Sequence, residues 1–141
     1  MTNQDPQARP PQPIPDSHKD LFHKRAFAHL ATLMPNGTPQ VTPVWVLLED
    51  GMLLVNSIKG HQKDRNIRNR RRVALSIQDP DQPYRYIAIR GPVVEITLHD
   101  AEAVIDRMSA KYTGDPVYQD RRPNEVRVTY KIRPDHVAVQ G

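Results

Sequence analysis

The chain has 141 residues, a formal net charge of +4 and no cysteine, which suits one domain and excludes a disulfide framework, a thiolate metal site and a cysteine nucleophile. It contains no apolar run of about 18 residues and no secretion signal at its start. We therefore expect a cytoplasmic protein that neither spans nor binds a membrane.

The start of the chain differs in composition from the rest. Five of the 14 prolines fall within the first fifteen residues, where Ile14 is one of few apolar side chains. Such a segment buries too little apolar surface to offset its ordering entropy. We predict a disordered tail over residues 1–16 and a single folded domain over residues 17–141.

The first half of the domain is typical of hairpins. A capping box at Ser17 predicts a short helix, and strands are expected over residues 28–34, 40–48 and 52–56. The pair Asn36 and Gly37 indicates a hairpin turn between the first two strands. Pro43 cannot donate to a ladder, so its strand is expected at a sheet edge or a bulge.

The second half combines helices and strands. We predict a basic helix over residues 60–70, strands over residues 73–78 and 84–96, and a bend at Gly91. A helix with a capping box at Thr97 and a stop at Gly114 follows. In a strand over residues 125–132, the alternation predicts Val126, Val128, Tyr130 and Ile132 inward and Arg127 outward. Residues 137–139 are expected to close the sheet.

Successive hairpins indicate antiparallel pairing. The expected fold class is mainly β (α+β), a small barrel of six to seven mostly antiparallel strands with flanking helices.

The positive charge is concentrated in one segment. Seven basic residues and one acidic residue lie between Lys59 and Arg72. A helix that is polar almost all round gains little from burial, and its first turn suits a phosphate. A solvated basic face is the alternative, and a nucleic-acid module is another, although the segment has no aromatic residue for base stacking.

Motifs of side-chain catalysis are missing. The sequence has no G-x-S-x-G elbow, no P-loop and no G-x-G-x-x-G, and its six histidines lack the spacing of zinc ligands. We predict no catalytic side chain and no metal site.

Four segments in order resemble the pyridoxamine 5'-phosphate oxidase-like flavin and deazaflavin oxidoreductases. Residues 31–45 resemble the opening hairpin of that family, residues 63–77 its basic helix and next strand, residues 83–91 the following strand, and residues 105–112 a later helix. The resemblance covers about residues 20–139. It is strongest to the small branch that uses coenzyme F420.

The resemblance implies a split β-barrel homodimer with two cofactor sites at the subunit interface. It places the cofactor phosphate against Lys63 and Asn66, with Lys59 and His61 nearby, although many relatives have arginine in place of this histidine. It implies that backbone groups from Gln40 to Val44 line the ring. The residues so implied as cofactor-binding are Gln40, Thr42, Pro43, Val44, Asn56, Ser57, Lys59, His61, Lys63, Asn66 and, from the other subunit, Tyr84 and Tyr86.

The function implied is transfer of hydride from reduced coenzyme F420 to an electron-poor small organic acceptor. The cofactor performs that chemistry, which agrees with the missing catalytic motifs. An FMN-binding oxidoreductase of the same fold and a non-catalytic flavin- or deazaflavin-binding protein remain alternatives. Pyridoxamine phosphate is not the expected substrate, because the basic C-terminal region of the vitamin-forming oxidases has no counterpart before Gly141.

Overall fold

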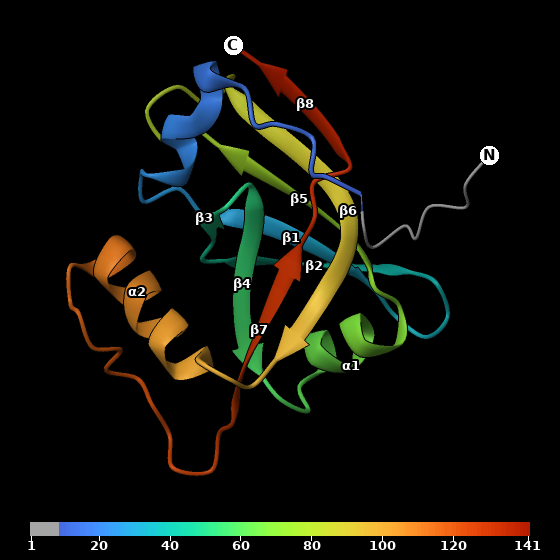
Figure 1. Cartoon of the computed structure of the whole chain (residues 1–141), viewed down its shortest axis with the longest axis vertical. Helices are drawn as coiled ribbons and strands as arrows, with labels where there is room; N and C mark the ends of the chain where they lie inside the picture. Colours follow the sequence, from blue (N-terminus) through green and yellow to red (C-terminus); the bar gives the residue numbers. More distant parts are fainter. Residues whose placement is uncertain (1–8) are drawn as a thin grey trace.

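The computed structural model describes residues 9–141, which form eight strands and three helices (Figure 1). Their bounds are η2 (Asp16–Phe22, a 3₁₀ helix), β1 (Ala28–Leu33), β2 (Pro39–Val44), β3 (Leu47–Glu49), β4 (Met52–Ile58), α1 (Gln62–Asn69), β5 (Arg72–Gln78), β6 (Tyr86–Thr97), α2 (Ala101–Thr113), β7 (Arg127–Ile132) and β8 (His136–Gln140). No helix in this part of the chain has the length and apolarity needed to cross a bilayer.

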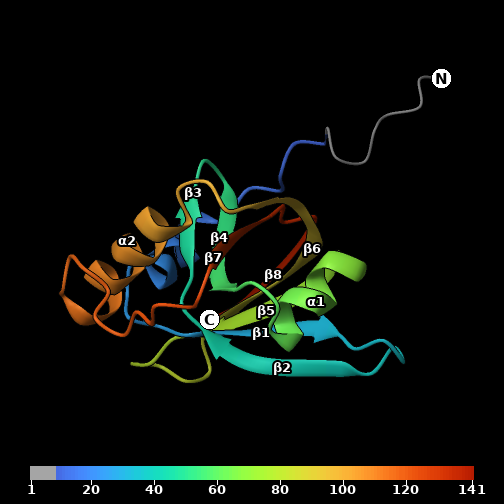
Figure 2. The ribbon, with the colours of Figure 1, turned by 90° about the horizontal axis from the view of Figure 1, so that it is seen from below.

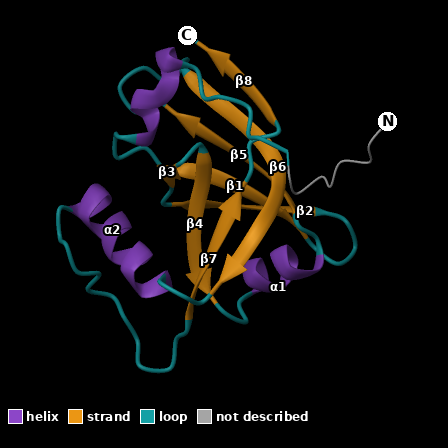
Figure 3. Ribbon diagram, viewed as in Figure 1, coloured by secondary structure: helices purple, strands orange, loops and turns teal. Residues whose placement is uncertain are grey.

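The strands form a split barrel, and every strand pair is antiparallel. The strand order is β2-β1-β5-β6-β7-β4-β3, with β8 also paired to β6. Figure 2 shows the strands around a common interior, with α1 and α2 outside it, and Figure 3 shows the helices at the periphery. The structure thus confirms the mainly β class, with one strand more than the six or seven expected.

Strand β6 belongs to both halves of the barrel. Its first part pairs with β5 and β8, and its second part pairs with β7, with a register shift between Val93 and Glu95. At Gly91, just before this shift, an added Cβ would lie 1.9 Å from the carbonyl oxygen of Arg133. Only glycine lets the two backbones approach so closely. The irregularity of β6 follows Val93, two residues beyond the predicted bend.

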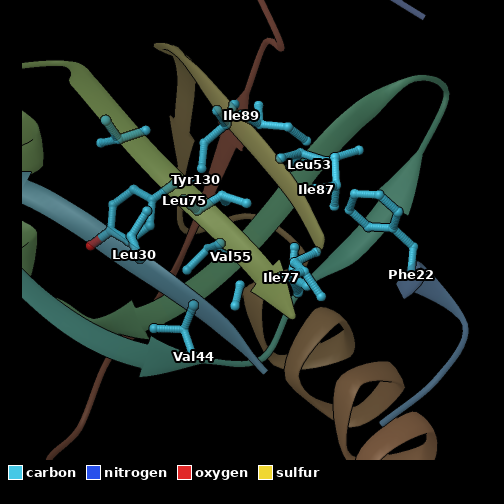
Figure 4. Close-up of a cluster of buried hydrophobic side chains, with 14 of the residues drawn as sticks. Phe22, Leu30, Val44, Leu53, Val55, Leu75, Ile77, Ile87, Ile89 and Tyr130 are labelled. Carbon is cyan, nitrogen blue, oxygen red and sulfur yellow. The ribbon is translucent and has the colours of Figure 1, made fainter. Parts of the chain in front are cut away.

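The core fills the space between the two halves (Figure 4). Leu30, Leu75 and Ile87 contribute from one half, and Leu53 and Tyr130 from the other, all at most 4% exposed. Each such aliphatic side chain contributes about 1.5–3 kcal/mol through burial. The core therefore joins the halves in addition to the strand that they share.

The single strand expected over residues 40–48 is wrong. The chain leaves the first half of the barrel after Val44 and joins the second half at Leu47. Between them the Val46 N–H donates to the Tyr112 hydroxyl (3.2 Å), and the Val46 carbonyl accepts from Lys111 Nζ (2.8 Å). Side chains of α2 replace ladder partners here, which local apolar content does not reveal.

Both expected capping boxes are also wrong. The 3₁₀ helix begins at Asp16, after Pro15, and no side chain caps it. The residue before α2 is Asp100, which has φ of 60° and makes no capping bond, while Thr97 Oγ1 accepts from the His99 N–H (3.0 Å). The predicted stop is confirmed, since Gly114 ends α2 with φ of 85°.

Two further expectations meet the structure only in part. Residues 1–8 of the expected tail lie outside the described residues, but disorder is wrong for residues 12–16: Ile14 is buried in the core, and the Gln12 N–H donates to the Pro134 carbonyl (2.8 Å). On β7, Val128 is buried as expected, whereas Val126 precedes the strand and is 49% exposed.

Replacing Gly91 with alanine tests the close approach of the two backbones. We expect Gly91→Ala to destabilise the protein by about 3 kcal/mol, because a backbone oxygen cannot move aside as a side chain does. Gly37→Ala is the control: its φ of 85° disfavours alanine, but no atom lies within 4 Å, so we expect a cost of about 1 kcal/mol. Urea unfolding measures both values, and equal losses would contradict the steric explanation.

Candidate functional site

A pocket of about 470 Å³ lies where α1, α2 and the ends of β2, β4 and β7 meet. We call it the α1–α2 pocket; the two helices flank the lower ends of β4 and β7 in Figure 1. The structure brings together there five of the residues expected to bind the cofactor: Pro43, Val44, Asn56, Ser57 and Lys63.

Local structure explains how these residues meet. Strand β2 is an edge strand that pairs only with β1, and an edge strand tolerates the missing N–H of Pro43. Strand β4 carries Asn56 and Ser57 and ends at Ile58, and residues 59–61 connect it to α1. Lys63 lies in the first turn of that helix. Its ammonium is therefore near the positive end of the helix dipole, where an anion is favoured.

Lys63 differs from its neighbours on the basic helix because its charge has no protein partner. Arg68 Nε contacts both carboxylate oxygens of Asp64 (2.9 and 3.0 Å), and Arg65 donates to the Gly60 carbonyl and to Gln62. Lys63 makes no hydrogen bond or ion pair within residues 9–141, and burial lowers the pKa of its ammonium. A desolvated, uncompensated cation in a pocket is typical of a ligand site.

Arg127 supplies a second cation that the sequence reasoning missed. It begins β7 opposite Ile58 and lines the same pocket. Its guanidinium contacts the Asn56 Oδ1 (3.4 Å) and the face of the Tyr118 ring (4.8 Å to the centroid). Strand alternation correctly placed Arg127 on the face of β7 that points away from the core, and the α1–α2 pocket lies on that face.

One wall of the α1–α2 pocket is aromatic. Phe27, Trp45 and Tyr118 line the pocket, together with apolar residues of α2. The Tyr112 ring stacks between Phe27 (5.6 Å between centroids) and Trp45 (5.3 Å), and Tyr118 meets Trp45 edge-on (6.0 Å). Such a wall suits a flat ring system.

The stack is fixed at its base by hydrogen bonds. The Tyr112 hydroxyl donates to the Ala26 carbonyl (2.8 Å) and accepts from the Val46 N–H (3.2 Å). Lys111 Nζ donates to the Val46 carbonyl and contacts the Tyr112 hydroxyl (3.3 Å). Burial lowers the pKa of Lys111 to about 8. These bonds hold the aromatic wall where it can contact a ligand.

The basic helix is held by a buried carboxylate. Asp64 accepts from the Tyr130 hydroxyl (2.6 Å), the Gly60 N–H (2.8 Å) and Arg68. Burial acts to raise the pKa of Asp64, but these three donors outweigh it, and the pKa lies below its ordinary value. The hydrogen bonds of Asp64 therefore fix the position of the helix without a bound ligand, which the net charge of the segment does not indicate.

Asn66 has a structural role in place of the expected phosphate contact. It is 0% exposed; its amide donates to Thr32 Oγ1 (3.1 Å) and lies 3.5 Å from Gln40 Oε1, and its carbonyl accepts from Gln62 (2.8 Å). These bonds join α1 to β1 and β2. Gln40 takes part in this network, and neither residue lines the α1–α2 pocket.

The remaining expected residues are dispersed. Lys59 is exposed, and His61 lines a neighbouring hollow of about 670 Å³, the loop pocket, which shares Tyr118 and Arg127 with the α1–α2 pocket. Tyr84 and Tyr86 are 79% and 36% exposed and line neither. Thr42 Oγ1 is the one buried side-chain oxygen or nitrogen without a hydrogen-bond partner in the described chain.

A sequence profile of the pyridoxamine 5'-phosphate oxidase family matches residues 14–141. The chain belongs to this family. No match was found among the curated proteins.

Solved structures agree with this membership in the pyridoxamine 5'-phosphate oxidase family. An F420 reductase is 32% identical, with a TM-score of 0.79 over 89% of this chain and 98% of that one. Two others share the fold alone. The conserved hypothetical protein Rv2991 from Mycobacterium tuberculosis is 24% identical, with a TM-score of 0.70 over 93% of this chain and 87% of that one. HupZ from Group A Streptococcus is 20% identical, with a TM-score of 0.61 over 88% and 91%.

The bond between Tyr130 and Asp64 can be tested by removing the hydroxyl. We expect Tyr130→Phe to cost about 1–3 kcal/mol, because a buried carboxylate loses a donor. The pKa of Asp64 should rise, since a hydrogen bond that favours its charged form is gone. Urea unfolding and NMR titration measure the two effects. Tyr84→Phe is the exposed control, and an unchanged Asp64 pKa in Tyr130→Phe would contradict the assignment.

The lowered pKa of Lys111 predicts a pH-dependent stability. Between about pH 8 and the ordinary lysine value, the unfolded chain keeps a proton that the folded protein has released, so the free energy of unfolding rises with pH. Lys111→Met removes this contribution. We expect the stability of the wild type relative to Lys111→Met to increase from about pH 7.5 to about pH 9.5 in urea unfolding. If the difference in unfolding free energy between the two proteins does not change with pH, the lowered pKa of Lys111 is contradicted.

Proposed function

We propose that this family member is an oxidoreductase that binds coenzyme F420 in the α1–α2 pocket and uses it to reduce a small electron-poor organic acceptor. The observation that carries the proposal is Lys63: a half-buried ammonium with no partner among the described residues, in a pocket with an aromatic wall. A planar ring bearing a phosphate satisfies both features.

The charge of Lys63 supports a phosphate ligand. Holding an unpaired ammonium away from water costs folding free energy, and a bound anion recovers that cost. A charge-assisted hydrogen bond to a phosphate oxygen contributes about 1.5–3 kcal/mol. The free N–H groups in the first turn of α1 and the positive end of the helix dipole also favour an anion there.

The residues present also fit the ring of a flavin-like cofactor. The aromatic wall offers Trp45 and Tyr118 for contact, and the β2 strand ends beside it at Pro43 and Val44. On that strand the orphaned Thr42 Oγ1 offers a hydrogen bond that nothing in the described chain uses. Asn56 and Ser57 would meet the polar side of the ligand.

When bound, coenzyme F420 supplies the hydride. The chain's own residues do the binding and orienting: Lys63 binds the phosphate, while Trp45 and Tyr118 hold the ring plane and exclude water from it. No side chain needs to act as nucleophile or general acid, which agrees with the sequence. The likeness to an F420 reductase favours a deazaflavin over FMN.

A dimer belongs to the proposal. The outer face of the sheet formed by β1, β2, β5, β6 and β8 carries a hollow of about 1010 Å³ lined by small and apolar residues such as Ala31, Val41 and Ala88. Val41 is 60% exposed there. A second copy covering this face would bury it and would bring Tyr84 and Tyr86 toward a partner's pocket.

The test removes the ammonium of Lys63. We expect Lys63→Met to weaken F420 binding at least tenfold, or by about 1.4 kcal/mol, in a fluorescence titration. The ligand-free variant should be more stable than the wild type by about 0.5–1 kcal/mol, because a desolvated charge is gone. Urea unfolding without cofactor measures that gain.

Arg71→Gln is the matched control, since it removes an exposed charge from the same basic segment. It should leave both F420 affinity and stability close to those of the wild type. Tight FMN binding without F420 binding would replace the deazaflavin by FMN in the proposal. Unchanged F420 affinity in folded Lys63→Met would overturn the phosphate site, and light scattering on the same samples reports the dimer.

A further inference from the structure

We propose that Arg127 is a second ligand-binding cation, and that it recognises a negative group of the ligand other than the phosphate bound by Lys63. The inference rests on the proposed function and narrows it: the ligand is extended and carries at least two separate anionic groups, the second of them a carboxylate.

The position of Arg127 carries the first part of the argument. Lys63 lines the α1–α2 pocket only, whereas Arg127 lines both this pocket and the loop pocket. Its backbone pairs with Ile58, and the adjoining Lys59 N–H donates to the Val126 carbonyl (2.8 Å). Arg127 is thus fixed in the wall that the two hollows share, along which a ligand longer than its ring and phosphate would extend.

The charge of Arg127 carries the second part. Its two contacts, the Asn56 carbonyl and the Tyr118 ring, are both neutral. Arg121, at the other side of the loop pocket, pairs with Glu102 (2.9 Å) and Asp106 (2.8 Å). The carboxylates of α2 are therefore engaged with Arg121. Asp120 and Glu125 also line the loop pocket, but neither pairs with Arg127, which makes no ion pair in residues 9–141.

The contacts of Arg127 fix its orientation. The Asn56 amide nitrogen donates to the Ala101 carbonyl (2.9 Å) and to Thr129 Oγ1 (3.2 Å), so its carbonyl oxygen is directed to the guanidinium. The backbone N–H of Tyr118 donates to Asp106 Oδ1 (2.8 Å), which fixes the ring beneath the charge. A guanidinium held in this way is preorganised, and its planar fork matches a carboxylate in a bidentate pair.

The arrangement discriminates between two classes of cofactor. A ligand with one terminal phosphate, such as FMN, satisfies Lys63 and leaves Arg127 unpaired. A ligand with a phosphate and a carboxylate-bearing extension, such as coenzyme F420, satisfies both cations.

The experiment compares Arg127→Gln with Arg71→Gln, which removes the same charge from an exposed position. Affinities for F420 and FMN are measured by fluorescence titration at low and high salt. We expect Arg127→Gln to weaken F420 binding at least tenfold, to leave FMN binding within twofold, and to reduce the salt dependence of F420 binding. Arg127→Lys, which keeps the charge without the fork, should fall between the wild type and Arg127→Gln.

The outcomes separate this inference from the proposed function. Equal losses for F420 and FMN would place Arg127 on the shared phosphate and overturn the inference, as would no loss for either. If the wild type binds neither cofactor, the proposed function fails, and citrate then becomes the probe. A citrate-dependent rise in Tm that Arg127→Gln loses and Arg71→Gln keeps would still support a carboxylate site at Arg127, and no rise in the wild type would overturn it. Circular dichroism verifies that each variant is folded.

Discussion

The position of the basic helix depends on one buried carboxylate. Asp64 accepts hydrogen bonds from Tyr130 on β7 and from the Gly60 N–H at the start of the helix, and it pairs with Arg68. A buried carboxylate is costly unless its oxygens are satisfied, so these bonds hold α1 in one orientation against the barrel. Lys63 is one residue away from Asp64, and its ammonium lies in the α1–α2 pocket because its neighbour faces the core.

The cations on and around the α1–α2 pocket fall into two sets. Arg68 and Arg121 pair with carboxylates and stabilise the fold locally. Lys63 and Arg127 line a pocket and have no acidic partner in the described residues. A charge that is desolvated without a partner reduces the stability of a protein. Such charges are found where a bound ligand supplies the opposite charge. This division supports a binding function for the pocket better than the net charge of the chain does.

Predictions that rest on glycine at turns and helix ends agree best with the structure. The turn between β1 and β2 contains Gly37 at φ of 85°, and α2 ends at Gly114, also at φ of 85°. Predictions that depend on distant partners were less accurate. The break at Val46 exists because its backbone groups bond to Lys111 and Tyr112, which lie 65 and 66 residues later in the chain. No pattern within the strand itself indicates those partners.

The sequence by itself determined the antiparallel barrel and the basic helix, because periodicity, turn residues and clustered charge are properties of neighbouring residues. Lys63 was singled out by the family resemblance. Only the tertiary structure decided which charges remain free. Asn66 is buried by contact with β1 and β2, and Arg127 reaches the pocket because β7 pairs with β4 at Ile58. Whether a polar side chain binds the protein or a ligand depends on what lies across from it, and pairing between strands far apart in sequence determines that.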